Sequence, residues 1–173
     1  MNLSKTLKKV LQEKKDKILS EWFEVVIHAY PDDMAYFLKR EKDAFANPVG
    51  QNIWNTIETI YKELLDSFDK EKIASGIDPL IRTRAVQNFR ASESVKFVFS
   101  LKEIIRNNFD FKDEDGGKSL YQLERMIDEI ALIGFDIYMN CKEKIYQLKA
   151  NHERSQTMKL LEKANLLCEC NNE

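Results

Sequence analysis

Apolar residues recur at intervals of three and four along most of this chain, which is the spacing of one face of an α-helix. The first such stretch runs from Leu3 to about Tyr30 and predicts one long helix. Pro31 ends it, because proline has no N–H and restricts the residue before it. Asp32 or Asp33 is expected to cap a short helix that follows. The apolar positions of the long stretch are Leu3, Leu7, Val10, Leu11, Ile18, Trp22, Val25 and Val26.

The sequence Asn47-Pro48-Val49-Gly50 predicts the start of the next helix, which runs to about Phe68. Asparagine is favoured at the N-cap, where its side chain accepts a bond from a free amide, and proline suits the first helical position. The buried face of this helix is expected to comprise Ile53, Ile57, Ile60, Tyr61, Leu64 and Leu65.

Two further details of this helix start can be predicted. Phe45 or Ala46 precedes the cap and is expected to pack onto Gln51 or Ile53, as in a hydrophobic staple. Gly50 is a poor helix former, and its expected use is to let another helix approach closely.

A connector from Ser67 or Asp69 through Gly76 is expected next. Asp78-Pro79 repeats the start pattern and predicts a helix over about 79–89. Another amphipathic helix, capped by Ser92 or the residue before it, carries Val95, Val98, Phe99, Ile105 and Phe109. The acidic segment 110–119 contains a Gly-Gly pair and is predicted to be a loop.

The last helix is predicted over 119–150, and such a helix spans about 48 Å at 1.5 Å per residue, long enough to project from a compact domain. Gly134 is expected to let a neighbouring helix approach closely. Met126, Ile133, Phe135 and Tyr138 widen the apolar face, so burial on more than one side is expected. Residues 1–150 are expected to form one domain, and 151–173 a helical extension and tail. The heptad-like positions are Leu120, Leu123, Ile127, Ile130, Gly134, Ile137 and Cys141.

Composition supports a helical fold. The chain has 173 residues, 43% of them hydrophobic, with five glycines and three prolines, too few for the many turns of a β architecture. The predicted fold is all-α, a single-domain bundle of about six or seven helices. A globin-like arrangement is one option for it.

Charge and cysteine content indicate the setting. The net charge of −2 gives no overall basic field for nucleic acid. Six lysines among the first 21 residues form a solvated helix face or, less favoured, a membrane-surface patch. The sequence shows no signal peptide or membrane span. Three scattered cysteines do not form a disulfide framework, so a cytoplasmic location is expected.

Residues that carry chemistry are few. The sequence contains no Gly-rich phosphate loop, HExxH, GxSxG or CxxC, so we expect no enzyme and no cofactor. Cys168 and Cys170 offer two thiolates, whereas a structural zinc needs four ligands. His28 is expected to be partly buried and hydrogen-bonded, with a haem or metal ligand in a globin-like pocket as the alternative. His152 is expected at the surface.

Arg82 and Arg84 stand two positions apart among apolar residues. Two helical positions differ by about 200°, so the two side chains cannot share a face. One of them is expected near the core, where a guanidinium needs carboxylate or carbonyl partners. Glu41 or Asp43 is the expected partner. The alternative is a pocket for an anion or effector built by the arginines.

Three stretches resemble a known family: ILSEWFEVVIHAYP (18–31), EKDAFANPVG (41–50) and RTRAVQNFRASESVKFVF (82–99). They contain the phrases F-x-N-P-V-G and R-x-R-A-V-Q, which include Asn47 and Gln87. These stretches are similar to the RsbRD-like N-terminal domain. This is the sensor-type domain of an RsbT co-antagonist of bacterial stress signalling. The resemblance covers about residues 7–110. The family usually has proline where Ala91 stands.

The resemblance implies a helical regulatory module, without haem. Members in stress signalling carry a STAS domain after the last helix, whereas this chain stops at Glu173, so control of the RsbT kinase is not implied. The favoured hypothesis is a cytoplasmic, non-enzymatic module that relays a signal by binding a partner protein or a second copy of itself. The alternative is a globin-like sensor in which His28 or the arginines face a small ligand or anion.

Overall fold

The computed structural model describes residues 3–41, 43, 45–109 and 114–164, without the side chains of 114 and 115. Within these ranges the chain forms seven α-helices and no strand, which confirms the all-α prediction. None of the described helices is both long and apolar enough to cross a membrane. The helices are α1 (Lys5–Glu13), α2 (Lys15–Ile27), α3 (Asp32–Arg40), α4 (Pro48–Leu65), α5 (Lys70–Val86), α6 (Ala91–Asn108) and α7 (Glu114–Lys163).

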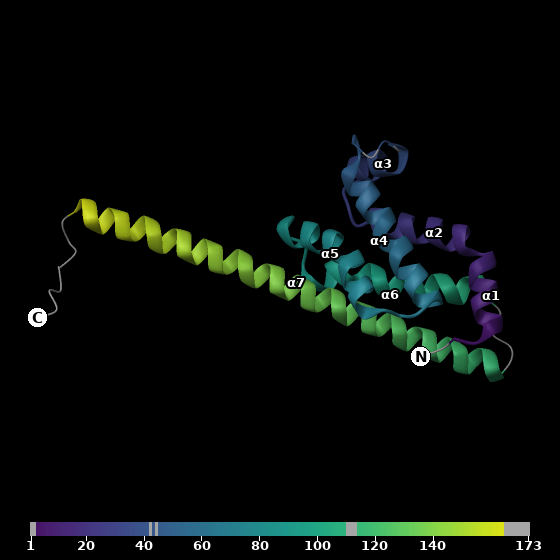
Figure 1. Cartoon of the computed structure of the whole chain (residues 1–173). Coiled ribbons are helices and arrows are strands. Elements are labelled where there is room, and N and C mark those ends of the chain that lie inside the picture. The colour runs from purple at the N-terminus through teal and green to yellow at the C-terminus, as the bar shows by residue number, and fades with distance from the viewer. Residues whose placement is uncertain (1–2, 42, 44, 110–113, 165–173) are drawn as a thin grey trace, which may run out of the picture.

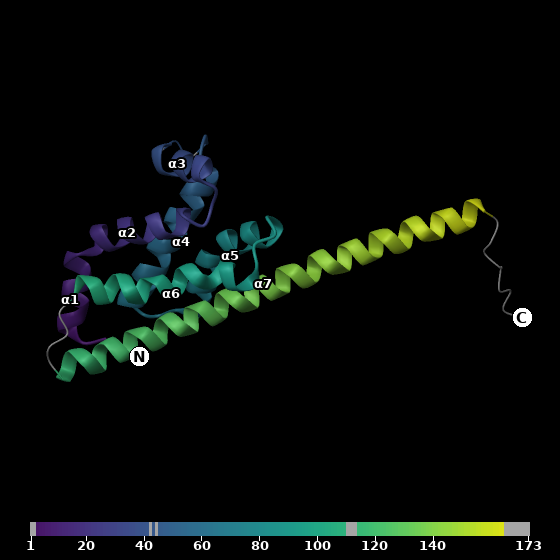
Figure 2. The ribbon, with the colours of Figure 1, turned by 180° about the vertical axis from the view of Figure 1, so that it is seen from behind.

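Helices α1, α2, α4, α5 and α6 form a bundle along one half of α7, and α3 projects from the side of the bundle away from α7 (Figures 1 and 2). Helix α5 packs against α4 on one side and α7 on the other, and α6 packs against α7 and α2. A single apolar core fills the space between them, and its largest buried side chains include Trp22 and Tyr61. Buried polar atoms also join the elements: Trp22 Nε1 donates to Phe97 O of α6 at 2.7 Å, and Tyr61 Oη donates to Leu11 O of α1 at 2.7 Å.

The prediction of one helix from Leu3 to Tyr30 is wrong, because the chain bends at Lys14 into α1 and α2. The Lys14 side chain donates to the carbonyl of Asn108, so the bend is held against the end of α6. Apolar residues on both sides of the bend are buried. The helical spacing of apolar residues in the sequence therefore continues across the bend and does not reveal it. Pro31 follows α2 as expected, but it is itself the N-cap residue of α3, where an aspartate was predicted.

The predicted cap at Asn47 is confirmed. Its Oδ1 accepts from Gly50 N at 2.8 Å, and Pro48 occupies the first position of α4. Its Nδ2 donates to Leu38 O at 3.0 Å and to Glu41 O at 2.8 Å. Asn47 is 4% exposed, so one buried amide joins the end of α3 to the start of α4.

The two further predictions at this helix start are wrong. Phe45 is 99% exposed and forms no staple. A Cβ at Gly50 would lie 2.3 Å from Asn47 Nδ2, so the glycine makes room for the cap and not for another helix. Glycines admit neighbouring helices elsewhere. A Cβ at Gly76 would lie 2.5 Å from Thr59 of α4, and one at Gly134 would lie 3.3 Å from Ile77 of α5, which confirms the prediction for Gly134.

Three predicted boundaries need correction. Helix α5 begins after Asp69, whose carboxylate accepts from Glu71 N and Lys72 N, so the expected connector is helical and Pro79 lies inside the helix. Helix α6 begins earlier than predicted, with Arg90 as N-cap residue and its amide donating to the Glu93 carboxylate at 3.0 Å. Helix α7 includes most of the predicted loop, and residues 110–113 lie outside the described residues.

The predicted heptad positions of α7 face the core, and Leu123, Ile127, Ile130 and Cys141 are buried. Met126 and Tyr138 are buried and Ile133 packs against the core, so these residues widen the apolar face as predicted. The prediction is wrong for Phe135, which is 41% exposed, and one side of α7 therefore forms an edge of the bundle. Beyond Cys141 the helix leaves the bundle and continues through residue 150 to Lys163, with nearly all its side chains exposed (Figure 1).

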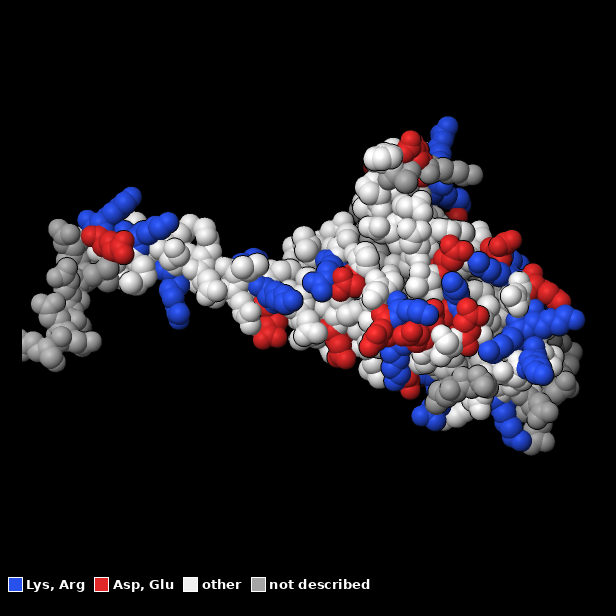
Figure 3. Space-filling model, viewed as in Figure 1, with Lys and Arg blue, Asp and Glu red and all other residues white. Residues whose placement is uncertain are grey.

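Charged side chains of both signs cover the bundle in this view, and basic side chains gather at the end that carries α1 (Figure 3). Leu7 and Leu11 of α1 are buried, and Lys15 pairs with Glu58 of α4 at 3.0 Å. The lysines of α1 thus share a helix whose leucines are packed in the core, and the choice between a solvated face and a membrane-surface patch stays a prediction.

Gly50→Ala is expected to destabilise the protein by about 1–2 kcal/mol, although alanine is the better helix former, because its Cβ displaces the side chain that caps α4. The matched control is Gly117→Ala in α7, where nothing lies within 4 Å of an added Cβ. That change is expected to stabilise by up to about 1 kcal/mol. Urea unfolding of both variants measures this, and equal effects would contradict the assignment of the cap.

Candidate functional site

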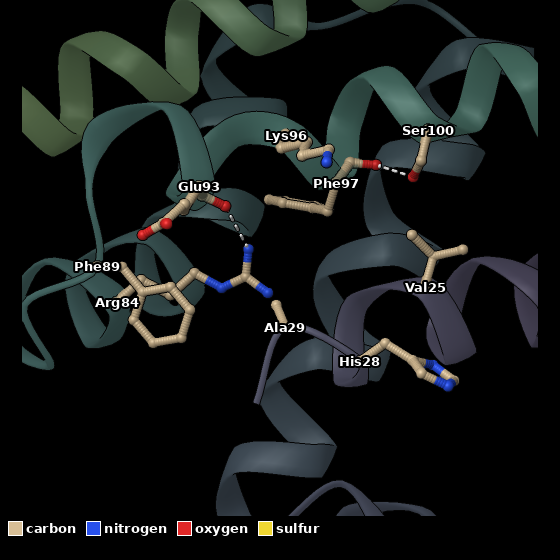
Figure 4. A pocket seen from close by; sticks show the side chains of 9 residues that line it. All are labelled: Val25, His28, Ala29, Arg84, Phe89, Glu93, Lys96, Phe97 and Ser100. Carbon is tan, nitrogen blue, oxygen red and sulfur yellow. Dashed lines mark hydrogen bonds between the residues drawn. The ribbon is translucent and has the colours of Figure 1, made fainter. Parts of the chain in front are cut away.

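A pocket of about 450 Å³ lies between the end of α2, the end of α5 and the first half of α6. Figure 4 shows its lining, with Arg84 on one side and His28 on the other. Part of the wall is apolar: Val25 comes from α2, Ala29 follows that helix, Phe89 lies between α5 and α6, and Phe97 belongs to α6. The polar lining residues are His28, Arg84, Glu93, Lys96 and Ser100.

Arg84 is the fully buried charge of this site, with 0% of its surface exposed. Its Nη1 donates to the carbonyls of Glu93 at 3.3 Å and Ser94 at 3.2 Å, and its Nη2 donates to Val26 O at 3.2 Å. One guanidinium from α5 therefore joins the end of α2 to the first turn of α6. The planar fork of arginine suits carbonyls that come from two directions, which a lysine ammonium cannot match in geometry.

Three aromatic rings surround the same guanidinium. Its Cζ lies 5.6 Å from the ring centre of Tyr30, 5.4 Å from that of Phe89 and 5.1 Å from that of Phe97. A cation within about 6 Å of a ring centre is attracted by the ring's negative face, more strongly when water is excluded. The rings thus offset part of the cost of removing this charge from water.

The compensation is incomplete. Arg84 Nε and the hydroxyl of Tyr30 make no hydrogen bond of acceptable geometry within the described part of the chain. Burial lowers the pKa of Arg84 below its ordinary value, and the nearby Tyr30 opposes that shift in part. Arginine keeps its proton at physiological pH all the same, so the site holds a buried positive charge.

The prediction that only one of the two arginines is near the core is confirmed. Arg82 lies at the surface, where its Nε donates to Asp78 Oδ2 at 2.6 Å. The predicted partners of the inner arginine are wrong: Glu41 and Asp43 belong to the turn before α4, where Glu41 accepts from Asp43 N. Carbonyl groups take their place: that of Val26 in the last turn of α2, and those of Glu93 and Ser94 in the first turn of α6.

The remaining predicted site residues are spread over the fold. Glu41 and Asn47 meet at the start of α4, and Gln87 is an exposed residue that ends α5. His28 lines the pocket, and the predicted hydrogen bond is present, with Nδ1 2.6 Å from Glu24 O, but the prediction that it is partly buried is wrong, because it is exposed. A carbonyl only accepts, so Nδ1 carries a proton and Nε2 is left to face water or a ligand.

Sequence reasoning missed the aromatic and lysine residues of the site. Tyr30, Phe89, Phe97 and Lys96 come from three separate segments, and no spacing rule joins them. The one available signal was an arginine on an apolar helix face, which requires partners wherever the chain brings them. The described residues contain no group of three or more His, Cys, Asp or Glu side chains placed to hold a metal, and Cys168 and Cys170 lie outside the described residues.

A second pocket, of about 500 Å³, lies between α1, α2 and α4 and is lined by Lys8, Gln12, Lys15, Tyr61, Lys62, Leu65 and Asp66. Its volume is similar, but its lysines are not buried, and the Tyr61 hydroxyl is already bonded to Leu11 O. We therefore regard the pocket beside Arg84, with its buried charge, as the candidate functional site.

The family model for the RsbT co-antagonist protein rsbRD N-terminal domain matches residues 16–152, more than half of the chain. The chain belongs to this family, and the match extends further along α7 than the phrases that suggested it. Membership points to a signalling or regulatory role.

The other comparisons add little about function. The chain is similar to a protein of Archaeoglobus fulgidus described as "Uncharacterized protein", with 24% identity over 140 residues, covering 80% of this chain and 84% of that protein. No solved structure matches the chain. The globin-like arrangement therefore stays a prediction.

Arg84→Lys is expected to destabilise the protein by about 3 kcal/mol or more, because an ammonium cannot reach carbonyls on two helices and each charged hydrogen bond is worth about 1.5–3 kcal/mol. Arg82→Lys is the matched control, with the same chemical change two residues away on the surface, and it is expected to change stability by less than about 0.5 kcal/mol. Urea unfolding followed by circular dichroism compares the two. Similar midpoints would show that Arg84 does not join the helices.

Proposed function

We propose that this protein is a cytoplasmic, non-enzymatic regulatory module that relays a signal through protein–protein contacts, and that its first partner is a second copy of itself along α7. The observation that carries the proposal is an exposed apolar stripe on this helix. Its members lie within about 60° of one another around the helix axis at 100° per residue. They are Tyr121, Leu132, Phe135, Met139 and Tyr146, each between 41% and 64% exposed.

The projecting part of α7 supports the same proposal. Lys142 bonds to Asn88 and Ile145 packs against the core, but every residue of the helix from 146 to 160 is exposed, so the bundle does not stabilise this part. An isolated helix shorter than about 15 residues is marginal in water, and one modestly longer gains little, because most helical stability in proteins comes from packing. Exposed Leu160 lies about 20° from Phe135 around the helix axis and offers apolar surface for such packing on the same side. A partner that covers α7 supplies the missing contacts.

The heptad positions of α7 do not serve this purpose. Leu123, Ile127 and Ile130 pack within the chain's own bundle, so the stripe centred on Leu132 and Phe135 is the face available to a partner. One face of α7 thus packs in the bundle, and the other face is exposed and available for association.

Family membership supports the signalling part of the proposal, since the family is named after the N-terminal domain of an RsbT co-antagonist protein. A role in a stress response, which the resemblance suggested, is part of the same proposal. Ser100, His28 and Glu93 also line the pocket, but the Ser100 hydroxyl donates to Phe97 O at 2.6 Å, and no described hydrogen bond joins it to His28 or Glu93. Non-enzymatic action is proposed because the pocket therefore does not hold a nucleophile bonded to a base.

Purified protein is expected to sediment as a dimer at tens of micromolar concentration. Replacing Phe135 and Met139 by glutamate places charges on the stripe, and the dimer dissociation constant is expected to rise at least about tenfold, which is about 1.4 kcal/mol. Sedimentation equilibrium measures both.

The control variant replaces Asn140 and Lys144 by glutamate, which gives the same spacing on another exposed face of α7. It is expected to dimerise as the unchanged protein does. A strictly monomeric protein at several hundred micromolar would contradict the proposed self-association, and equal weakening by both variants would contradict the assigned face.

A further inference from the structure

Arg84 differs from the three arginines that pair with carboxylates. Arg82 pairs with Asp78, Arg90 with Glu93, and Arg106 with Glu124, all at the surface. Arg84 is the buried member, yet within the described part of the chain no carboxylate lies at ion-pair distance from it. Its three carbonyl partners supply partial charges only. The guanidinium therefore keeps a net positive charge in the wall of the pocket.

One further cation adds to this field. Lys96 is exposed at the edge of the pocket and supplies a second positive charge. The carboxylate of Glu93 is the opposing charge, but it accepts from Arg90 N at 3.0 Å and Arg90 Nε at 3.2 Å, and Figure 4 shows it directed away from Arg84. The local balance therefore favours an anion.

The shape of the pocket selects among anions. Its volume of about 450 Å³ falls within the usual range of small-molecule sites. Val25, Ala29, Phe89 and Phe97 give it an apolar wall that inorganic phosphate or sulfate would leave unfilled. A molecule with one negative group and an apolar body satisfies both halves of the lining.

We infer that the pocket beside Arg84 binds a small organic carboxylate, with the carboxylate facing Arg84 and Lys96 and the apolar body against Val25, Ala29 and Phe97. Because Arg84 is fully buried, it acts on the ligand mainly through its charge and keeps its carbonyl partners. The inference is independent of self-association along α7, and the two are tested by different measurements.

Sodium benzoate is the probe, because it joins one carboxylate to a compact apolar ring. Trp22 provides the readout, since its indole Nε1–H donates to Phe97 O and its ring centre lies 6.2 Å from that of Phe97, a residue of the pocket wall. In a ¹H–¹⁵N correlation spectrum, benzoate is expected to shift the Trp22 indole signal in a saturable way. Benzamide, the neutral analogue, and inorganic phosphate are expected to bind at least about tenfold more weakly.

Three variants locate the binding without touching the buried arginine. Lys96→Gln is expected to weaken benzoate binding about threefold or more, and Ala29→Leu, at an exposed wall position, is expected to abolish it by filling the pocket. Lys62→Gln, an exposed lysine of the other pocket, is the matched control and is expected to leave binding unchanged.

Several results would overturn the inference. A Trp22 signal that does not move with benzoate would remove the site. Equal binding of benzamide would show an apolar cavity without selection for charge, and equal binding of phosphate would show a simple anion site. Weakening by Lys62→Gln equal to that by Lys96→Gln would place the binding elsewhere.

Discussion

A guanidinium taken out of water has five N–H groups to satisfy and a charge to offset, and few places in a small helical bundle can do both. In this protein the place is the junction where α2 ends and α6 begins. The last turn of α2 leaves carbonyls without intrahelical partners, and carbonyls in the first turn of α6 can each accept a second bond. Arg84 reaches that junction from α5 and bonds to carbonyls of Val26, Glu93 and Ser94. The relative position of three helices, and with it the shape of the pocket, depends on this one side chain.

The same junction is connected to α7. Tyr138 of α7 donates its hydroxyl proton to Phe89 O at 2.5 Å, and Phe89 is both a wall of the pocket and one of the rings around Arg84. Lys142, one turn further on, donates to Asn88 Oδ1 at 3.3 Å. These contacts lie where α7 leaves the bundle. A molecule that altered the position of Phe89 would thus act on the helix through two bonds to adjacent residues.

Local chemistry explains which parts of the fold were predictable. Asn47 and Pro48 determine their own helix start by steric and hydrogen-bond rules that operate within four residues, and the cap has the predicted form. Asp78-Pro79 has the same local pattern, yet Pro79 lies inside a helix. Asp69 caps this helix earlier in the chain, and the packing of α5 against α4 and α7 favours a helix that continues through Pro79. The break at Lys14 was missed because both of its sides face the core. The angle between Arg82 and Arg84 predicted one buried arginine, whereas its partners come from segments about ten and sixty residues away and depend on the tertiary fold.

The straight extension of α7 has a mechanical consequence. About 20 residues of continuous helix beyond the bundle reach about 30 Å at 1.5 Å per residue. A tilt of about 10° where the helix leaves the bundle would move its far end by about 5 Å, so the extension works as a lever. Rearrangements too small to expose the core would become displacements as large as a helical turn, at a distance where another protein can respond to them.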